Sequence, residues 1–230
     1  MPLPKFKTVT RTQGNNRALK DGTVKPKTFE FDFVEVDPLI AAFRRMVRGN
    51  EFDICEMAIT TYICAKSYGK RFTAVPVFLV RAFHHGAILV NTKAGISTPK
   101  DLEGKRVGVS RGYTVTTGVW ARAILQEEYG VDLGKITWVL SGDEHVETYR
   151  PPANVVPLEA GKKMADELIA GRLVAAIGES STCRDQDVLA GLRCPGPPAG
   201  AAHRSAPPVT TLTNASSKLA GTSATVPRSS

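Results

Sequence analysis

Two adjacent histidines and an arginine follow an apolar stretch of this 230-residue chain. His84 and His85 come after residues 75–80, and Arg81 stands between the two groups. An imidazole titrates near neutral pH and can transfer a proton, and a guanidinium grips a carboxylate in a two-point geometry. Because neighbours on an extended segment point to opposite sides, one histidine at most faces a ligand, and we favour His85 over His84. The alternative for Arg81 is an ordinary surface ion pair.

Further polar candidates lie nearer the N-terminus. Glu56 ends an expected strand and precedes Thr60 and Thr61, which we count among the substrate-binding candidates. The Glu56 carboxylate can accept a hydrogen bond from a ligand hydroxyl or cap the next helix, and the sequence leaves both readings open. Arg17 is a second candidate for binding an anion, again with a surface ion pair as the alternative.

A cluster of hydroxyl residues opens an expected helix in the middle of the chain. The residues are Tyr113, Thr114, Thr116 and Thr117, and a buried strand and a loop precede them. Free backbone amides and the helix dipole attract a carboxylate at such a position. The alternative is plain N-capping by threonine. We expect anion binding here.

Alternating strands and helices must position these side chains. Strands are expected at 29–33, 52–57, 72–80, 87–91, 106–110, 136–140, 154–158 and 173–177, and helices between Asp37-Pro38 and Gly49 and at 60–68, 116–129 and 162–170. This alternation predicts an α/β fold with largely parallel sheets. Ligands of such folds bind at the carboxyl ends of the strands.

Composition narrows the classes of function. The formal charge is +8, from 30 Lys and Arg against 22 Asp and Glu, but the basic residues are scattered, so an anionic ligand is favoured over nucleic acid. No stretch is long and apolar enough to cross a bilayer, and residues 1–11 lack the apolar run of a secretory signal, so we expect a cytoplasmic protein. The four cysteines form no CxxC pair, which predicts free thiols, no metal site and no disulfide framework.

The last fifty residues differ in character from the rest. Residues 181–230 contain no Phe, Tyr or Trp and are rich in Pro, Ala, Ser, Thr and Gly. Such a segment buries too little apolar surface to offset its ordering entropy, so disorder is expected. The abrupt change suggests, as a hypothesis, a truncated chain in which a frameshift or recombination supplies an unrelated tail.

Several segments in order resemble one enzyme family. Residues 101–109 are similar to the turn and strand that open the second lobe of type II periplasmic-binding-protein folds. Residues 52–57, 59–62, 75–78 and 81–85 resemble the 4,5-dihydroxyphthalate decarboxylase group within that fold, and the likeness runs from about residue 5 to 178. The sequence differs from the group at residues 13–16. It also differs at His84 and Gly86, on either side of His85, which matches the group's histidine.

The resemblance implies a two-lobed fold with a ligand held in the cleft between the lobes. We expect an incomplete first lobe at 1–98, a second lobe at 99–180 and the tail at 181–230. The implied activity is decarboxylation of a dihydroxylated aromatic acid such as 4,5-dihydroxyphthalate, without a cofactor. Arg17 and Arg81 would hold the remaining carboxylate, His85 would protonate the ring, and Glu56 would face a phenol. The alternatives are a non-catalytic solute-binding protein of an ABC-type transport system and an inactive truncated product. The oligomeric state stays open.

Overall fold

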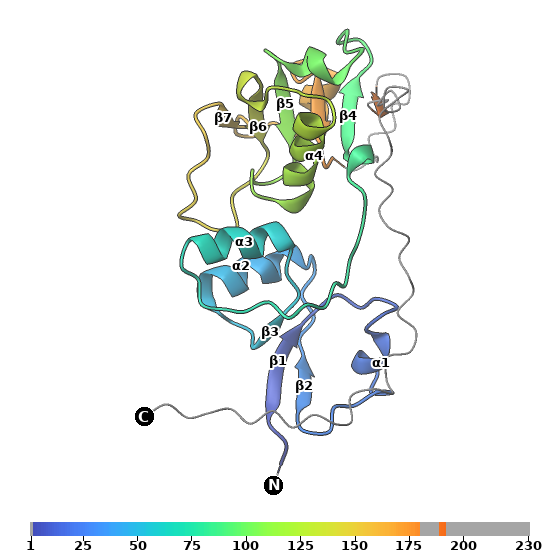
Figure 1. Ribbon diagram of the computed structural model, residues 1–230, viewed down its shortest axis with the longest axis vertical. Helices are drawn as coiled ribbons and strands as arrows, with labels where there is room; N and C mark the ends of the chain where they lie inside the picture. Colours follow the sequence, from blue (N-terminus) through green and yellow to red (C-terminus); the bar gives the residue numbers. More distant parts are fainter. Residues whose placement is uncertain (1, 180–188, 192–230) are drawn as a thin grey trace, which may run out of the picture. The chain divides into compact units, whose positions relative to one another are not determined.

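A computed structural model describes residues 2–179 and 189–191 (Figure 1). The N-terminal part contains the elements β1 (Lys5–Val9), α1 (Arg17–Lys20), β2 (Glu30–Phe33), α2 (Ile40–Gly49), β3 (Ile54–Cys55) and α3 (Ile59–Ser67). The elements that follow are the 3-10 turn η1 (His85–Ala87), β4 (Ile88–Asn91), η2 (Pro99–Leu102), β5 (Arg106–Val109), α4 (Thr116–Glu127), η3 (Leu133–Lys135), β6 (Thr137–Leu140), β7 (Val155–Pro157), α5 (Met164–Ile169), β8 (Ala175–Ile177) and β9 (Leu189–Gly191). No helix in this described part is both long and apolar enough to span a bilayer.

The first lobe is built on a small parallel sheet with the strand order β2-β1-β3. Its central strand, β1, was not predicted, because Lys5 and Lys7 interrupt the apolar pattern. Helix α2 buries Ala42, Met46 and Val47. The helix ends at Gly49, as predicted, and the next residue, Asn50, adopts a left-handed conformation with φ 49°.

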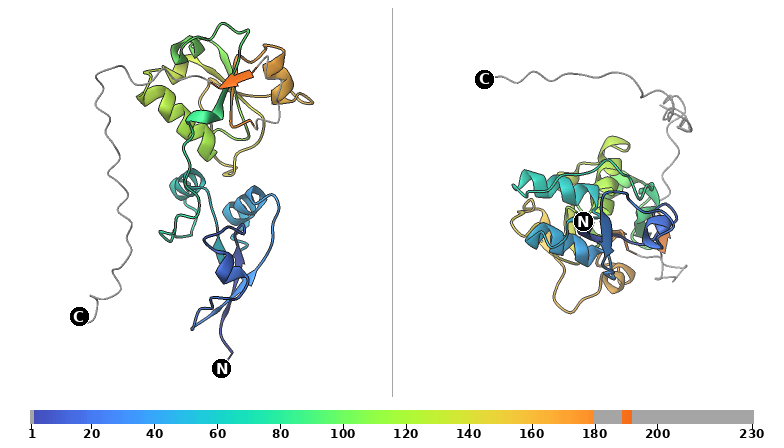
Figure 2. Two further views of the ribbon diagram at one scale, coloured as in Figure 1. Left: turned by 90° about the vertical axis from the view of Figure 1, so that its right-hand side faces the viewer. Right: turned by 90° about the horizontal axis from the view of Figure 1, so that it is seen from below.

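The second lobe is built on a six-stranded sheet with the order β7-β6-β5-β8-β4-β9. Strands β7, β6, β5 and β8 are parallel, and β4 runs antiparallel to both of its neighbours. Neighbouring strand residues point to opposite faces, so Trp138 packs in the core on one face and Val139 in the core on the other. Helices α4 and α5 cover these two faces, and Figure 2 shows α5, in orange, across the sheet from α4.

A glycine sets the spacing between this sheet and α5. A Cβ atom on Gly108 of β5 would lie 2.8 Å from the sulfur of Met164. A side chain at this position would have to displace the Met164 side chain, so glycine favours the close approach of the helix to the strand. The covered, largely parallel sheet confirms the predicted α/β class.

Three predictions about the elements are wrong. Residues 72–80 form no strand, because within the described residues they have no partner strand and their backbone makes only the local bond Val77 N–H to Val75 O and one bond to the Asn15 side chain. The boundary between the lobes lies before residue 88 rather than at 98, because β4 pairs with β8. The predicted tail contains a strand, since β9 pairs with β4. The remainder of 181–230, to which the prediction of disorder applies, lies outside the described residues.

Candidate functional site

The N-terminal ends of α3 and α4 meet. The Thr60 hydroxyl donates to the carbonyl oxygen of Thr114 at 2.8 Å and lies 2.8 Å from the Thr116 hydroxyl. The residues that precede the two helices, Ala58 and Val115, have no side chain that can cap a helix. The first-turn amides of both helices therefore remain available, and both dipoles place positive charge at this junction. The sequence grouped Thr114 and Thr116 and named Thr60 separately, beside Glu56; the structure brings the three threonines together. None of the three threonines is the N-cap residue of α3 or α4.

An internal carboxylate occupies the loop before α4. Glu144, in the segment after β6, accepts hydrogen bonds from the backbone N–H of Tyr113, from that of Thr114 at 3.1 Å and from the Thr114 hydroxyl at 2.5 Å. A Cβ on Gly112 would lie 2.8 Å from this carboxyl group, so glycine is required beside it. The amides expected to bind a ligand carboxylate thus hold the carboxylate of Glu144.

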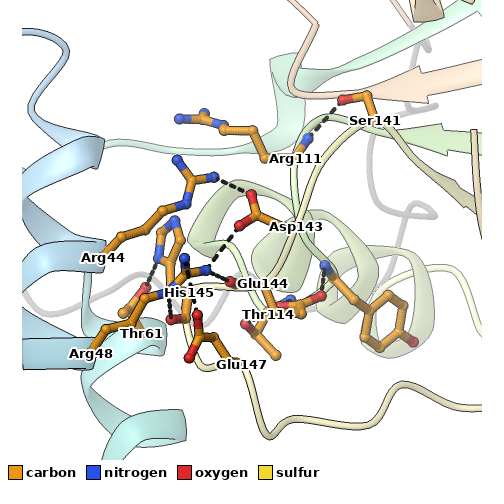
Figure 3. Close-up of polar contacts among 11 residues, drawn as sticks. Arg44, Arg48, Thr61, Arg111, Thr114, Ser141, Asp143, Glu144, His145 and Glu147 are labelled. Atoms are coloured by element: carbon orange, nitrogen blue, oxygen red, sulfur yellow. Dashed lines mark hydrogen bonds and ion pairs between the residues drawn. The ribbon is translucent and has the colours of Figure 1, made fainter. Parts of the chain in front are cut away.

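Two arginines of α2 bind the segment after β6 that contains Glu144 (Figure 3). Arg44 and Arg48 lie one helical turn apart, and each donates to Asp143, at 2.8 and 2.9 Å. Arg48 also donates to the carbonyl oxygen of Glu144 at 2.9 Å and pairs with Glu147 at 3.3 Å. Through these contacts the segment after β6 ties the two lobes together.

A buried histidine lies beside these ion pairs. His145 is 1% exposed, and its Nδ1 lies 2.8 Å from the hydroxyl of Thr61 on α3. Its Nε2 has no hydrogen-bond partner in the described part of the chain. Burial, reinforced by the positive charges of Arg44 and Arg111, lowers the pKa of His145 to about 4. The imidazole is therefore neutral at pH 7.

Arg111 is a candidate anion ligand in this region. Its φ of 69° is a left-handed conformation that residues other than glycine seldom adopt, and its backbone N–H donates to Ser141 Oγ at 2.9 Å. Its guanidinium has no hydrogen bond or ion pair with any described residue, whereas Arg44 is held by Asp143. The Arg111 side chain extends toward the Arg44 side of the segment in Figure 3. Strain of this kind at an unpaired cation is typical of functional positions.

A second arginine supports the loop from within the second lobe. Arg122 of α4 is 6% exposed and donates to the carbonyl oxygen of Tyr113 at 2.6 Å. Its guanidinium carbon lies 3.6 Å from the centre of the Tyr113 ring, a close cation–π contact. Burial lowers the pKa of Arg122, and its Nη1 has no partner among the described residues.

The predicted histidines lie at other positions along α4. His85 Nε2 is 3.0 Å from Glu128, which directly follows the last residue of α4. Twelve helical residues span about 18 Å, so His85 and Thr116 lie near opposite ends of the helix. The His84 ring stacks on Trp120, with 6.4 Å between the ring centres, and Trp120 is half exposed rather than in the core. The catalytic roles of His84 and His85 stay predictions, but the structure does not place His85 beside the threonines.

The remaining predicted residues also have other contacts. Glu56 accepts from the Thr10 hydroxyl at 2.7 Å and from the Arg11 N–H at 3.0 Å, so it caps no helix. Arg17 is an exposed residue at the start of α1. Arg81 is exposed and lies over the Phe78 ring. Thr117 lies against Gly178, where a Cβ would be 3.4 Å from its methyl group.

The described residues contain no cluster of the usual metal-ligating side chains. Among them, no three His, Cys, Asp or Glu side chains gather as ligands would. Cys55 and Cys64 are free thiols, and burial raises the pKa of Cys55 to about 12. A hollow of about 400 Å³ lies against Phe29, Phe31 and Phe33 on the first lobe, and Leu19 and Lys20 of α1 also line it.

Sequence reasoning missed the charged and titratable residues that gather here, among them Arg44, Arg48, Arg111 and His145. Two signals were present. Arginines four residues apart lie on one side of a helix, opposite the apolar stripe of α2. The segment Ser141–His145 follows a parallel strand, which is where ligands bind in this class. Nothing in the sequence indicated that the two segments meet.

Comparison with known proteins identifies the family. Residues 29–176, more than half of the chain, match the family described as "ABC transporter, phosphonate, periplasmic substrate-binding protein". The chain belongs to this binding-protein family. Its fold agrees with that of the periplasmic aliphatic sulphonate binding protein SsuA of Escherichia coli, with a TM-score of 0.51 and 16% identity over 84% of this chain and 60% of SsuA. The expected fold of the periplasmic-binding-protein type is confirmed.

Two curated relatives of this family member carry an enzyme name. The 4,5-dihydroxyphthalate decarboxylase of Comamonas testosteroni is 36% identical over 179 residues, which are 74% of this chain. That of Pseudomonas putida is 35% identical over 170 residues, which are 70% of this chain. These matches confirm the similarity predicted from the sequence. They cover 54% and 65% of the relatives' own lengths.

Proposed function

We propose that this protein is a carboxy-lyase that acts on a dihydroxylated aromatic acid such as 4,5-dihydroxyphthalate. The observation that carries the proposal is the 35–36% identity to two relatives that bear this name. The geometry supports it, because cations and helix N-termini gather at the contact between the lobes. The partner proposed is thus a small anionic aromatic molecule. The cytoplasmic location expected from the sequence stays a prediction.

The unpaired Arg111 guanidinium is the group proposed to bind the carboxylate that remains on the ring. It is the strained, unpartnered cation of the site, whereas Asp143 already engages Arg44 and Arg48. The neutral His145 offers a free Nε2 to a polar group of the ligand. The Thr60 and Thr116 hydroxyls, at the two helix N-termini, are proposed to face the phenols.

The proposed reaction needs one electron pair and one proton. A ring hydroxyl para to the leaving carboxylate donates electron density to the carbon that bears this carboxylate, and a general acid protonates that carbon. The carbon–carbon bond then breaks, carbon dioxide leaves, and the bonding electrons return to the ring and restore its aromaticity. The sequence favours His85 as this acid. In the structure His85 is half exposed, is paired with Glu128 and lies near the opposite end of α4 from Thr116, so a ligand bound at the threonines would be out of its reach, and His85→Ala tests this role directly.

The test is to mix the purified chain with 4,5-dihydroxyphthalate and follow carbon dioxide release and ligand binding together. Four variants separate the candidates: Arg111→Met, Arg81→Met, Arg17→Met and His85→Ala. We expect Arg111→Met to raise the dissociation constant at least tenfold, because it removes the carboxylate's cation. Arg81→Met and Arg17→Met are the matched controls. A loss of binding in these two, with Arg111→Met unaffected, would instead support the arginine pair suggested by the sequence.

A second candidate function is solute binding without catalysis. The family match favours it, because that family is described by transport. The same fold serves several functions, so the fold alone does not decide between them. Saturable binding with no carbon dioxide from the folded wild-type chain would favour this candidate. Release of carbon dioxide that His85→Ala abolishes would favour the carboxy-lyase and assign the acid.

A further inference from the structure

We propose that Glu144 is an internal occupant of a carboxylate-binding subsite and that a carboxylate of the ligand replaces it. The subsite consists of the backbone N–H groups of Tyr113 and Thr114, the Thr114 hydroxyl and the space that Gly112 leaves open. The inference rests on the proposed function, since it assigns a second anion position to a ligand with two carboxylates.

The contacts show that these donors accept a carboxylate. Three donors converge on the Glu144 carboxyl group, and two of them share one of its oxygens. Gly112 must lack a side chain for that group to enter, because a Cβ there would lie 2.8 Å from the Glu144 oxygen. A ligand carboxylate presents the same two oxygens, so it can form the same three hydrogen bonds.

A buried cation gives independent support for an anion at this position. Arg122 is 6% exposed, its Nη1 is unpartnered, and no described residue forms an ion pair with it. Its guanidinium lies against the Tyr113 ring, and its Nη1 would be 3.2 Å from a Cβ on Gly118 in the first turn of α4. A buried charge is costly, and the negative charge of Glu144 partly offsets the lowering of the Arg122 pKa by burial, so this arginine favours a negative charge in the adjacent loop.

Glu144 is held in a way that permits exchange. Within the described part of the chain it has no ion pair, and its carboxylate bonds only to neutral donors. The three donors thus lose their hydrogen bonds to Glu144 and form an equal number to the incoming carboxylate. The residues on either side, Asp143 and His145, contact Arg44 and Thr61 of the first lobe. Replacement of Glu144 would therefore alter the contact between the lobes as the ligand enters.

Calorimetric titration with phthalate tests the exchange, because phthalate has both carboxylates but no ring hydroxyl to drive decarboxylation. We expect Glu144→Gln to bind phthalate at least fivefold more tightly than the wild-type chain, since the competing charge is gone. Glu127→Gln makes the same charge change on an exposed residue of α4 and should stay within twofold of wild type. Equal or weaker binding by folded Glu144→Gln would overturn the proposal.

A second variant tests where phthalate binds. Adding Thr114→Val to Glu144→Gln removes a donor of the subsite and should reverse most of the gain in affinity. No change would show that phthalate binds elsewhere, and the proposal would fail. If Glu144→Gln does not fold, NMR of the wild-type chain replaces it. Phthalate should then shift the Tyr113 and Thr114 amide signals, and unchanged signals would contradict the exchange.

The outcome is separable from that of the proposed function. Tighter phthalate binding by Glu144→Gln, with no carbon dioxide from 4,5-dihydroxyphthalate, would reject the carboxy-lyase and keep the exchange. Carbon dioxide release by the wild-type chain, with equal phthalate affinity in both proteins, would keep the carboxy-lyase and reject the exchange.

Discussion

The two lobes differ in how completely their sheets are covered. The second lobe has a six-stranded sheet with a buried core on each face, and twelve buried residues form the larger of the two cores. The first lobe has three strands, and the largest core confined to it contains four buried residues. The aromatic face formed by Phe6, Phe29, Phe31 and Phe33 borders an open hollow.

Because their packing differs, the two lobes contribute different kinds of group to the site. The well-packed lobe contributes groups that need fixed positions, namely the loop amides, the strained Arg111 and the buried His145. The thinner lobe contributes Arg44 and Arg48, long side chains on a helix surface that can adjust to a moving partner. Rigid elements hold a site more accurately than adjustable ones. Mutations in the second lobe should therefore act mainly on stability, and mutations in the first lobe mainly on the contact between the lobes.

The largest expected effect comes from removing the central side chain of the second lobe. Trp138 is fully buried, so Trp138→Ala should lower the free energy of unfolding by about 4 kcal/mol. Phe52→Ala in the first lobe should cost less, about 3 kcal/mol, because Phe52 lies beneath Lys7 and Arg45, whose flexible chains can relax. Urea unfolding followed by circular dichroism measures both. An equal or larger loss for Phe52→Ala would contradict the comparison.

The next effect concerns pH. The pKa of His145 falls from 6.5 to about 4 on folding, so the unfolded chain binds a proton between these values and the folded chain does not. Stability should thus fall as the pH drops from about 6.5 to 4, by at most about 3 kcal/mol, with no contribution above that window. Urea midpoints at pH 7.5, 6 and 5 measure this. His145→Gln should reduce the slope, and a slope equal to that of the wild-type chain would refute the assignment.

The two left-handed residues provide a smaller test. Arg111→Gly should raise stability by about 0.5–1 kcal/mol, because glycine adopts φ 69° without steric cost. Asn50→Gly, its counterpart in the first lobe, should change stability little, since asparagine tolerates this conformation. If Arg111 also binds the ligand, the first variant should gain stability and lose affinity together. Thermal unfolding and phthalate titration of the same samples measure the two quantities. A less stable Arg111→Gly would argue against backbone strain.

The smallest effect concerns the ion pair that joins the lobes. Arg48 and Asp143 are 32% and 59% exposed, so a double-mutant cycle with alanine should give a coupling energy of about 0.5 kcal/mol. The coupling should decrease further in 1 M salt, because exposed charges are screened. A coupling above about 2 kcal/mol would mean that this pair, rather than packing, holds the lobes together. Unfolding midpoints of the four proteins at both salt concentrations provide the measurement.

The sequence by itself determined the fold class and most elements. Apolar periodicity identified β2, β4, β5, β6, β7, β8 and the helices α2 to α5, because burial on one face or both leaves a pattern in the chain. The ordered motifs identified the family. Residues 72–80 have the composition of a strand but lack a partner, and a strand needs hydrogen bonds that its own sequence cannot supply.

Only the tertiary structure decided which side chains form the site. The sequence named His85 and the threonines of α4 as separate candidates, and the structure places them near opposite ends of that helix. It gave no reason to choose His145, whose burial and lowered pKa arise from α2 and α3, about a hundred residues earlier in the chain. The occupation of the predicted anion-binding amides by Glu144 is likewise a contact between segments 30 residues apart. Such contacts depend on chain topology, which local patterns do not encode.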